Sequence, residues 1–562
     1  MNKIKLVPIG IDNFKEIVES YYYIDKTNMI EELLKSGSKA TLITRPRRFG
    51  KTLNMSMLKY FFEDARDFKG NKIDNSHLFN SLYISSSEYM SEQGKYPVIN
   101  LSFKECKKDT WKEAFTQLKE VIQDEYERHE YILESENIRP RDRKFFEKIL
   151  DDELEDNVYD KSIVKLCMLL ENYHQIPTIV LLDEYDVILQ NAYVKGFYKE
   201  ACNFISTFFG KTFKQNDYMK FAVITGCLRI SKESIFTGWN NVDVQTTIGN
   251  RYLTSIGITI EEKNKLLEYY SLQAEDNIIK EWYDGYNFNG IEIYNPWDLL
   301  NYIRDKKDNA SSEPKSYWIG TSGNDVLKEM LEDKNNEIQN SIKLLIQGKE
   351  IKKSINEQLT YGYLKAELQN IWSLLLFTGY LTGTKDKNTE LYKLRIPNKS
   401  IKKCYISQIE EYNKHQMKPT FASELKKHMI NNDGDKLEEL LNEYLNSVIS
   451  YYDDIEAFYH GLITGLCSNI LDYEEDSNKE AGKGRADIIL HPSEDYTLPG
   501  IILEFKWIKN PVSLENSAKK ALEQIDKKQY YKAFGVSVKN IRKFGIAFSG
   551  KKCKVAYEKI SK

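Results

Sequence analysis

Three charged residues near the carboxyl end of the chain could together do metal-dependent chemistry on a phosphate. Asp487 precedes one apolar run, and Glu504 and Lys506 stand about 17 residues further on, inside another. Because side chains alternate between the two faces of a strand, Glu504 and Lys506 are predicted to project from one face. Asp487 and Glu504 offer the oxygen ligands that magnesium prefers, and Lys506 can stabilise charge developing on a phosphate. The pattern predicts a magnesium-dependent nuclease centre; a surface strand with solvated charges is the alternative.

The segments around these residues could complete the centre. Residues 454–466 have the period of an amphipathic helix, and Glu456 on it could bring a third carboxylate to the metal. Residues 518–531 form a second predicted helix, which carries Gln524. From Glu504 onward, lysine and arginine outnumber aspartate and glutamate about three to one. A local basic surface of this kind suits a phosphate backbone.

The region from about residue 450 to 562 resembles the PD-(D/E)xK nuclease superfamily, in the version attached to AAA-ATPase-like proteins of bacteria. The resemblance implies a metal and catalytic centre of Glu456, Asp487, Glu504 and Lys506, with Gln524 as an auxiliary residue. Ala486 replaces the proline of the motif, a harmless departure because the aspartate supplies the ligand. The segments that carry the resemblance are Phe458-Tyr459-His460-Gly461, 482–487, Glu504-Phe505-Lys506 and Ala521-Leu522-Glu523-Gln524-Ile525.

A second possible site lies near the amino end, where a β-rich run at 41–44 leads into a Gly-Lys-Thr triplet and then a helical pattern. A strand, a loop and a helix are the context that a phosphate-binding loop requires. Lys51 would reach the β- and γ-phosphates of ATP, and Thr52 would bind magnesium. Arg45 stands where the general motif has its first glycine, so the loop is more cationic than usual. The whole loop reads Arg45-Pro46-Arg47-Arg48-Phe49-Gly50-Lys51-Thr52.

A partner for this loop is predicted at the end of the apolar run 178–182. Such a run is typical of a central parallel strand buried on both faces, and ligands bind at the carboxyl ends of such strands. Asp183 would hold magnesium, directly or through water, and Glu184 would polarise the attacking water. Asp186 would cap the following helix. The alternative is a buried strand that merely exits into solvent through acids.

A further strand is predicted at 220–226. Thr225 at its end could sense the γ-phosphate, and Arg229 could stabilise transferred charge or report the nucleotide state. Alternatively, Thr225 and Arg229 have no role in nucleotide binding, since threonine at a strand end and arginine at a helix start are common.

These N-terminal segments resemble the AAA-ATPase-like family, a relative of the archaeal P-loop ATPases. The octet from Arg45 to Thr52 is the most specific part, and an arginine-rich loop is normal for that family. The resemblance implies ATP and magnesium as cofactors. Other matching segments are Pro8-Ile9-Gly10-Ile11, Tyr23-Ile24-Asp25-Lys26-Thr27, Leu182-Asp183-Glu184-Tyr185-Asp186, Trp282-Tyr283-Asp284-Gly285-Tyr286 and Tyr294-Asn295-Pro296-Trp297.

The 562 residues are too many for one hydrophobic core, and the predicted fold class is α/β. Residues 104–171 are predicted to be a charged, mostly helical insertion in the ATPase core. Residues 371–397 suggest a winged-helix-like element, with a generic helix-hairpin module as the alternative. The expected domains are a P-loop ATPase core with a parallel sheet (1–255), a helical lid with the winged-helix-like element (256–400), a helical connector (401–450) and a restriction-endonuclease-like α/β domain (451–562).

The composition limits which binding partners and which cellular compartment are expected. The formal net charge is only −4, so affinity for nucleic acid would have to come from local patches. Seven cysteines without a CxxC pair favour free thiols, and no apolar run approaches the length of a membrane span, so a cytoplasmic protein without a membrane partner is expected. The Arg45, Arg47 and Arg48 cluster could also reach a neighbouring subunit's nucleotide, which leaves a homo-oligomer open.

The expected function is a nuclease controlled by ATP, acting on DNA in preference to RNA, in bacterial defence or mobile-element biology. The alternative is a nucleotide-dependent switch or scaffold, whose nuclease-like domain binds a partner or nucleic acid without cutting it.

Overall fold

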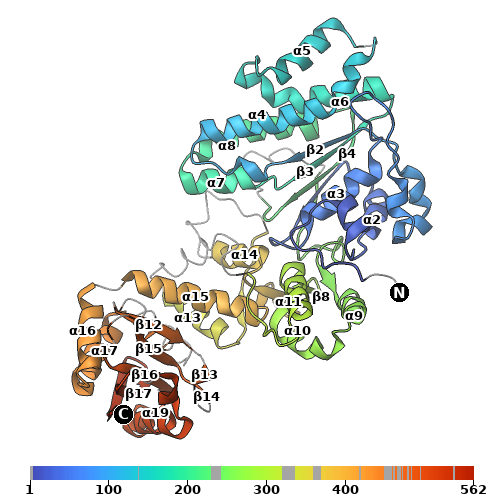
Figure 1. The fold of residues 1–562 in the computed structure, drawn as a ribbon. Helices are drawn as coiled ribbons and strands as arrows, with labels where there is room; N and C mark the ends of the chain where they lie inside the picture. Colours follow the sequence, from blue (N-terminus) through green and yellow to red (C-terminus); the bar gives the residue numbers. More distant parts are fainter. Residues whose placement is uncertain are drawn as a thin grey trace. The chain divides into compact units, whose positions relative to one another are not determined.

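The computed structural model divides into two compact units, residues 1–322 with 352–400 and residues 323–351 with 401–562 (Figure 1). The predicted ATPase core and most of the lid region fall in the first unit. The predicted connector and nuclease-like domain fall in the second. The structure describes residues 4–136, 138–229, 242–318, 336–357, 369–416, 419–448 and 459–561, the last with gaps at 460–462, 465–466, 468–469, 471, 478–479, 482–483, 494, 496 and 536–537.

A five-stranded parallel sheet of order β2-β3-β4-β1-β5 forms the centre of the first unit. β1 and β3 are buried along their whole length, as expected of parallel strands covered on both faces. Helices α4, α6 and α8 lie on one side of the sheet, and α2 and α3 lie on the other (Figure 1). The predicted α/β class is confirmed. The strands are β1 (Ala40–Thr44), β2 (Val98–Ser102), β3 (Thr178–Asp183), β4 (Met219–Gly226) and β5 (Val242–Gln245).

The strand order brings three carboxyl ends together. β4 pairs with β1 on one side and with β3 on the other, so the residues that follow these three strands share one edge of the sheet. α3 (Lys51–Phe62) starts after the loop that follows β1, and its N-cap Gly50 has a φ of 91°. Only glycine adopts this conformation without a steric cost. The strand-loop-helix order predicted from the sequence therefore stands at the ligand-binding edge of the sheet.

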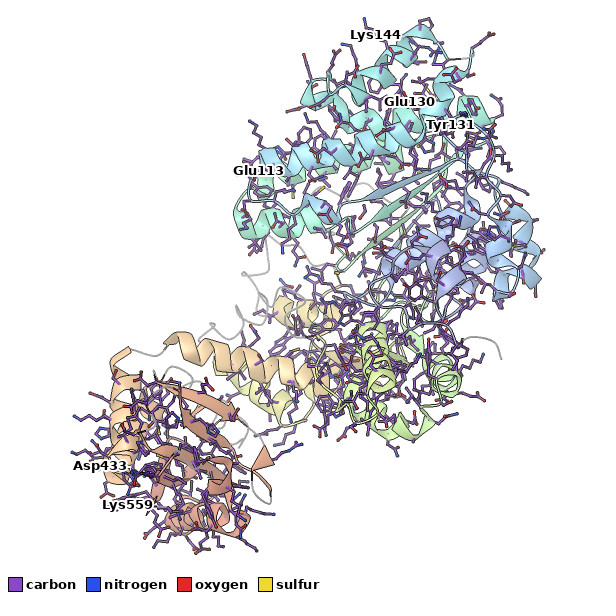
Figure 2. The ribbon with its side chains drawn as sticks, in the orientation of Figure 1. Glu113, Glu130, Tyr131, Lys144, Asp433 and Lys559 are labelled. Atoms are coloured by element: carbon purple, nitrogen blue, oxygen red, sulfur yellow. The ribbon has the colours of Figure 1, made fainter. Side chains whose placement is uncertain are left out.

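The predicted helical insertion between β2 and β3 is confirmed. A capping box between Thr110 and Glu113 fixes the start of α4, and Figure 2 labels Glu113 and Glu130 near its two ends. The helices of the insertion are α4 (Trp111–Arg128), α5 (Pro140–Leu150) and α6 (Ser162–His174). The other helices of the core are α1 (Phe14–Ser20), α2 (Asn28–Ser36), α7 (Val187–Lys195) and α8 (Tyr198–Phe209).

A smaller layer follows the core sheet. Its antiparallel sheet β6-β8-β7 packs with α9, α10 and α11 around a core that includes Tyr283, Tyr294 and Tyr302. After it, α14 (Gln369–Thr378) is followed by the hairpin β10 (Thr382–Lys385) and β11 (Tyr392–Arg395), with β9 (Ile351–Lys353) as a third strand. The helix-then-hairpin order matches both alternatives predicted for 371–397. The smaller layer comprises β6 (Ile258–Thr259), α9 (Ile260–Tyr269), α10 (Asp276–Tyr283), β7 (Tyr286–Phe288), β8 (Ile291–Tyr294) and α11 (Pro296–Asp308).

The second unit is built on a mixed sheet of order β12-β15-β16-β17-β18. β16 and β17 are parallel, and α19 (Leu514–Lys528) connects them. α17 (Gly434–Val448) is attached to β18 through Asn442, whose side chain bonds both backbone polar groups of Cys553. The strands are β12 (Tyr473–Ser477), β15 (Ile488–Pro492), β16 (Gly500–Trp507), β17 (Asn540–Ser549) and β18 (Lys552–Ser561), with a short β13 (Glu480–Ala481) and β14 (Gly484–Arg485) pair beside them; further helices are α13 (Asn336–Ile346), α15 (Lys399–Gln416) and α16 (Pro419–Ile430).

Across the described part of the chain, no helix combines the length and the apolar character needed to cross a lipid bilayer.

Candidate functional site

Asp183 is the centre of a hydrogen-bonded group at the carboxyl edge of the parallel sheet. Thr52 Oγ1 donates to Asp183 Oδ2 at 2.6 Å, and Thr225 Oγ1 donates to Asp183 Oδ1. The three residues come from α3, β3 and β4. The strand order explains the meeting, because β4 lies between β1 and β3. A carboxylate beside a threonine hydroxyl is an oxygen donor set that suits magnesium.

Lys51 lies within the curve of the loop that follows β1. Its ammonium donates to the carbonyl oxygens of Arg45 at 3.1 Å and Pro46 at 3.0 Å, and it lies 3.7 Å from the thiol sulfur of Cys227. Lys51 is 5% exposed. A buried ammonium group held by two backbone carbonyl oxygens is placed to pair with an anion bound in the loop.

Arg45 is fully buried and serves as an anchor of the loop. Its guanidinium donates to the carbonyl oxygens of Thr44, Gln245, Arg251 and Tyr252, at 2.7 to 3.4 Å. Burial lowers the pKa of Arg45 to about 9. These contacts give Arg45 a role in holding the loop, and whether it also contacts nucleotide stays a prediction.

The remaining side chains of the loop contact the layers around the sheet. Arg47 donates to Gln190 Oε1 on α7 at 2.7 Å. Phe49 is 1% exposed and packs edge-on against Tyr286, with ring centroids 5.0 Å apart. Pro46 is buried beneath Gly379, the residue that follows α14. Contacts of its side chains thus hold the loop in place.

Glu184 and Arg229 follow the ends of β3 and β4. Glu184 has a φ of 52°, and burial raises the pKa of its carboxyl group above the usual range. A strained, partly desolvated carboxylate next to Asp183 is a candidate general base. Arg229 is half-buried in the segment after β4.

The predicted capping role of Asp186 is wrong. Asp186 is the N-cap residue of α7, but its side chain makes no capping bond there. Asp186 Oδ2 instead accepts from the backbone N–H groups of Cys227 and Leu228, both at 2.9 Å. The carboxylate therefore holds the loop after β4 against the end of β3, a long-range bond that local sequence spacing could not reveal.

An apolar cavity of about 70 Å³ opens beside the start of α3. Gly50 and Leu53 form its floor, and Tyr22, Tyr23 and Ile258 are among the residues that line it. The sequence offers the run Tyr21-Tyr22-Tyr23 as a possible border of an adenine site, with core packing as the alternative, and two of the three line this cavity. Its apolar lining next to the phosphate loop offers a surface for one face of a planar aromatic ring.

The second site lies where β15 and β16 separate in the C-terminal unit. Asp487 immediately precedes β15, and its Oδ2 accepts from the backbone N–H of Phe505 at 2.7 Å. Lys506 Nζ lies 3.8 Å from Glu504 Oε1, so these two side chains occupy one face of β16 as the alternation predicted. Phe505 is buried on the opposite face, 5.9 Å from the ring of Phe548.

α19 completes this site. Gln524 Nε2 donates to Glu504 Oε1, and it lies 3.5 Å from the hydroxyl of Tyr530. Tyr530 in turn donates to the carbonyl oxygen of Arg485 at 2.7 Å. Burial raises the pKa of Tyr530, with smaller contributions from the negative charges of Glu504 and Asp487. Both carboxylates therefore lie near this hydroxyl.

The donor set suits a divalent metal ion. Glu504 is 2% exposed, and a buried carboxylate beside a second one is costly unless a cation pairs with them. A carboxylate has about four lone-pair positions, so one accepted hydrogen bond leaves room for a metal ligand. Glu456 lies outside the described residues. Within the described ranges, no group of three or more His, Cys, Asp or Glu side chains forms a metal-binding cluster.

Several residues of these sites were not found from the sequence. Gln190, Cys227 and Gly379 contact the phosphate loop from segments far along the chain, and no local pattern marks them. The sequence predicts Tyr530 as part of the helix at 518–531, but the helix ends at Lys528, and Tyr530 reaches Gln524 from the turn that follows it.

Comparison with protein families agrees with both sites. Residues 8–236 match the family described as predicted AAA-ATPase, and residues 454–558 match the PD-(D/E)XK nuclease superfamily. The chain therefore carries an AAA-ATPase-like domain and a PD-(D/E)XK nuclease-like domain at its C-terminal end, and both resemblances drawn from the sequence are confirmed.

A curated relative is also similar to this chain. It is an uncharacterized protein in the vnfD 5' region of Azotobacter chroococcum mcd 1, 27% identical over 333 residues. The match spans 59% of this chain and 57% of the relative. The chain thus matches little more than half the length of that protein.

Proposed function

We propose that this protein binds and hydrolyses ATP with magnesium in its first unit, and that the nucleotide state controls a magnesium-dependent nuclease in its second. The nuclease part of the proposal rests on one observation. The side chains of four residues converge on one end of β16: Asp487, Glu504, Lys506 and Gln524. The contacts of Asp183 with Thr52 and Thr225 support the ATP part. DNA is the proposed substrate, in a role in bacterial defence or mobile-element biology.

The residues of the nuclease centre have separate roles in this proposal. Asp487 and Glu504 would hold the metal, and Gln524 fixes the orientation of the Glu504 carboxylate. Lys506, on the rim of the centre, would stabilise the charge that develops on the scissile phosphate. Bound magnesium would supply Lewis-acid stabilisation and a more acidic water. The lysine- and arginine-rich surface from residue 504 onward would hold the DNA backbone.

In the first unit, Lys51 and the amides at the start of α3 would bind the phosphates of ATP, and Thr52 and Asp183 would hold magnesium. Glu184 would accept a proton from the attacking water. The adenine ring would lie against the apolar lining at Tyr22 and Tyr23, next to Gly50. The seven cysteines are scattered along the sequence without a CxxC pair, which supports a reducing compartment such as the cytoplasm.

A cleavage assay tests the proposal. Purified full-length protein is incubated with plasmid DNA and, in parallel, with RNA, with magnesium and with or without ATP. We expect cleavage of DNA that Asp487→Asn abolishes and Lys506→Ala lowers on the order of 10²-fold. Lys427→Ala, an exposed lysine on α16 of the same unit and outside the basic surface, is the matched control. Cutting by Asp487→Asn would refute this centre. Nucleic-acid binding without cutting in every nucleotide state would instead support the switch or scaffold function.

A further inference from the structure

Arg48 of the phosphate loop is held by two tryptophans from the layer that follows the core sheet. Its guanidinium carbon lies 4.9 Å from the ring centroid of Trp297 and 5.9 Å from that of Trp318. Both distances fall within the range of about 6 Å in which a cation is attracted to an aromatic face. Trp297 belongs to the first turn of α11, and Trp318 is 1% exposed. A loop residue is thus clamped by residues some 250 positions further along the chain.

The backbone of Arg48 needs such support. Its φ is 67°, a left-handed conformation that is unfavourable for a residue with a side chain. Strained backbone of this kind persists only where the surrounding structure determines it. Arg48 stands three residues before Lys51, and its conformation sets the path by which the chain turns from β1 into α3.

Hydrogen bonds hold Trp297 itself in place. The indole N–H of Trp297 donates to the carbonyl oxygen of Tyr317 at 3.0 Å, and its backbone N–H donates to Asn295 Oδ1 at 2.8 Å. The next residue, Asp298, is fully buried, and its carboxylate accepts from Ser400 Oγ at 3.1 Å. Asp298 and Arg48 attract one another electrostatically. The positive charge of the loop is therefore met by the aromatic faces of Trp297 and Trp318, with the side chain of Asp298 nearby on α11.

We propose that Arg48 is a positioning residue for the nucleotide site. Held by Trp297 and Trp318, it fixes the loop in the conformation that presents Lys51 and Thr52, so that ATP affinity depends on the integrity of α11. The inference deepens the proposed function and rests on ATP binding at this loop. Arg48 itself need not touch the phosphates.

A double-mutant cycle tests the inference in the full-length protein. ATP affinity in the presence of magnesium is measured by calorimetry for wild type, Arg48→Ala, Trp297→Leu and the double variant. We expect each single variant to weaken ATP binding about tenfold, and the double variant to be no weaker than the worse single. Trp297→Phe, which keeps an aromatic face, should recover most of the affinity. A purely structural loss would lower the melting temperature without this pattern of recovery.

Trp282→Leu is the matched control. Trp282, on α10 of the same layer, also contacts a cation, since Lys399 Nζ lies 5.8 Å from its ring centroid. Its loss should leave ATP affinity unchanged. Wild-type affinity in Arg48→Ala, or fully additive losses in the double variant, would overturn the inference while leaving ATP binding established. Absence of ATP binding by the wild type would instead overturn the proposed function, and the positioning role with it.

Discussion

Thr52 Oγ1 donates a 2.6 Å hydrogen bond to Asp183 Oδ2, and this contact joins the first turn of α3 to the end of β3. Thr225 donates to the other oxygen of the same carboxylate from β4. Asp183 is therefore oriented from two sides by hydroxyl groups of elements far apart in the sequence. A carboxylate oriented in this way can hold a magnesium ion without losing its own position.

The Thr52 hydroxyl can be tested with two substitutions that differ by one group. Thr52→Val keeps the shape of the side chain and removes the oxygen, so we expect the apparent magnesium affinity in ATP hydrolysis to fall about 10–100-fold. Thr52→Ser keeps the hydroxyl and should stay close to wild type. Hydrolysis rates measured across a magnesium titration give the comparison. The same magnesium dependence in Val and Ser variants would remove Thr52 from the metal site.

Gln524 offers a corresponding test in the nuclease-like domain. Gln524→Ala frees the Glu504 carboxylate to rotate, and we expect plasmid cleavage to fall about 10–100-fold while DNA affinity stays unchanged. Raising the magnesium concentration should restore part of the rate, because orientation and not charge is lost. Cleavage rates at several magnesium concentrations, with DNA binding measured separately, check this.

Glu523→Ala is the control for that experiment, because Glu523 is an exposed neighbour on α19. Equal losses in the Gln524 and Glu523 variants would point to a damaged helix. Full activity in Gln524→Ala would show that the Gln524–Glu504 hydrogen bond has no part in catalysis.

Gly379 lies so close to the phosphate loop that it has no room for a side chain. A Cβ at this position would stand 2.9 Å from Pro46 Cβ, and the residue has a φ of 90°. We expect Gly379→Ala to lower the free energy of unfolding by about 1–3 kcal/mol and to weaken ATP binding, because Pro46 has to move. Gly290→Ala separates the two causes, since Gly290 has a φ of 94° but open space around it. An equal effect of both substitutions on ATP affinity would exclude a role for the Pro46 contact.

Local order made the two sites visible in the sequence. The apolar run before Asp183 predicted a buried parallel strand and the β-rich run before Arg45 predicted a strand, and the structure confirms both as β3 and β1. The alternation of Glu504, Phe505 and Lys506 likewise gave the correct faces of β16. In each case the information lies within a few neighbouring residues.

The directions of the arginine side chains could not be predicted in this way. Arg45 bonds carbonyl oxygens about 200 residues further along the chain, and Arg48 meets Trp297 and Trp318. A cluster of arginines next to a phosphate loop suggests contact with phosphate, because charge is all that the sequence shows. Tertiary packing uses two of these side chains to fix the loop, which no periodicity within the loop encodes.

The buried carboxyl group of Asp298 should make the stability of the folded protein depend on pH. Burial raises its pKa to about 7 from a usual value of 3.8. Between these two values the folded protein holds a proton that the unfolded protein releases, so this group makes the free energy of unfolding fall as pH rises, by at most about 1.4 kcal/mol per pH unit.

Asp298→Asn removes the titration and keeps the shape of the side chain. We therefore expect the melting temperature of wild type to fall more steeply than that of the variant between pH 5 and pH 7. Asp308→Asn, an exposed position on the same helix, should follow wild type, and parallel curves for wild type and Asp298→Asn would show that Asp298 does not titrate in this range.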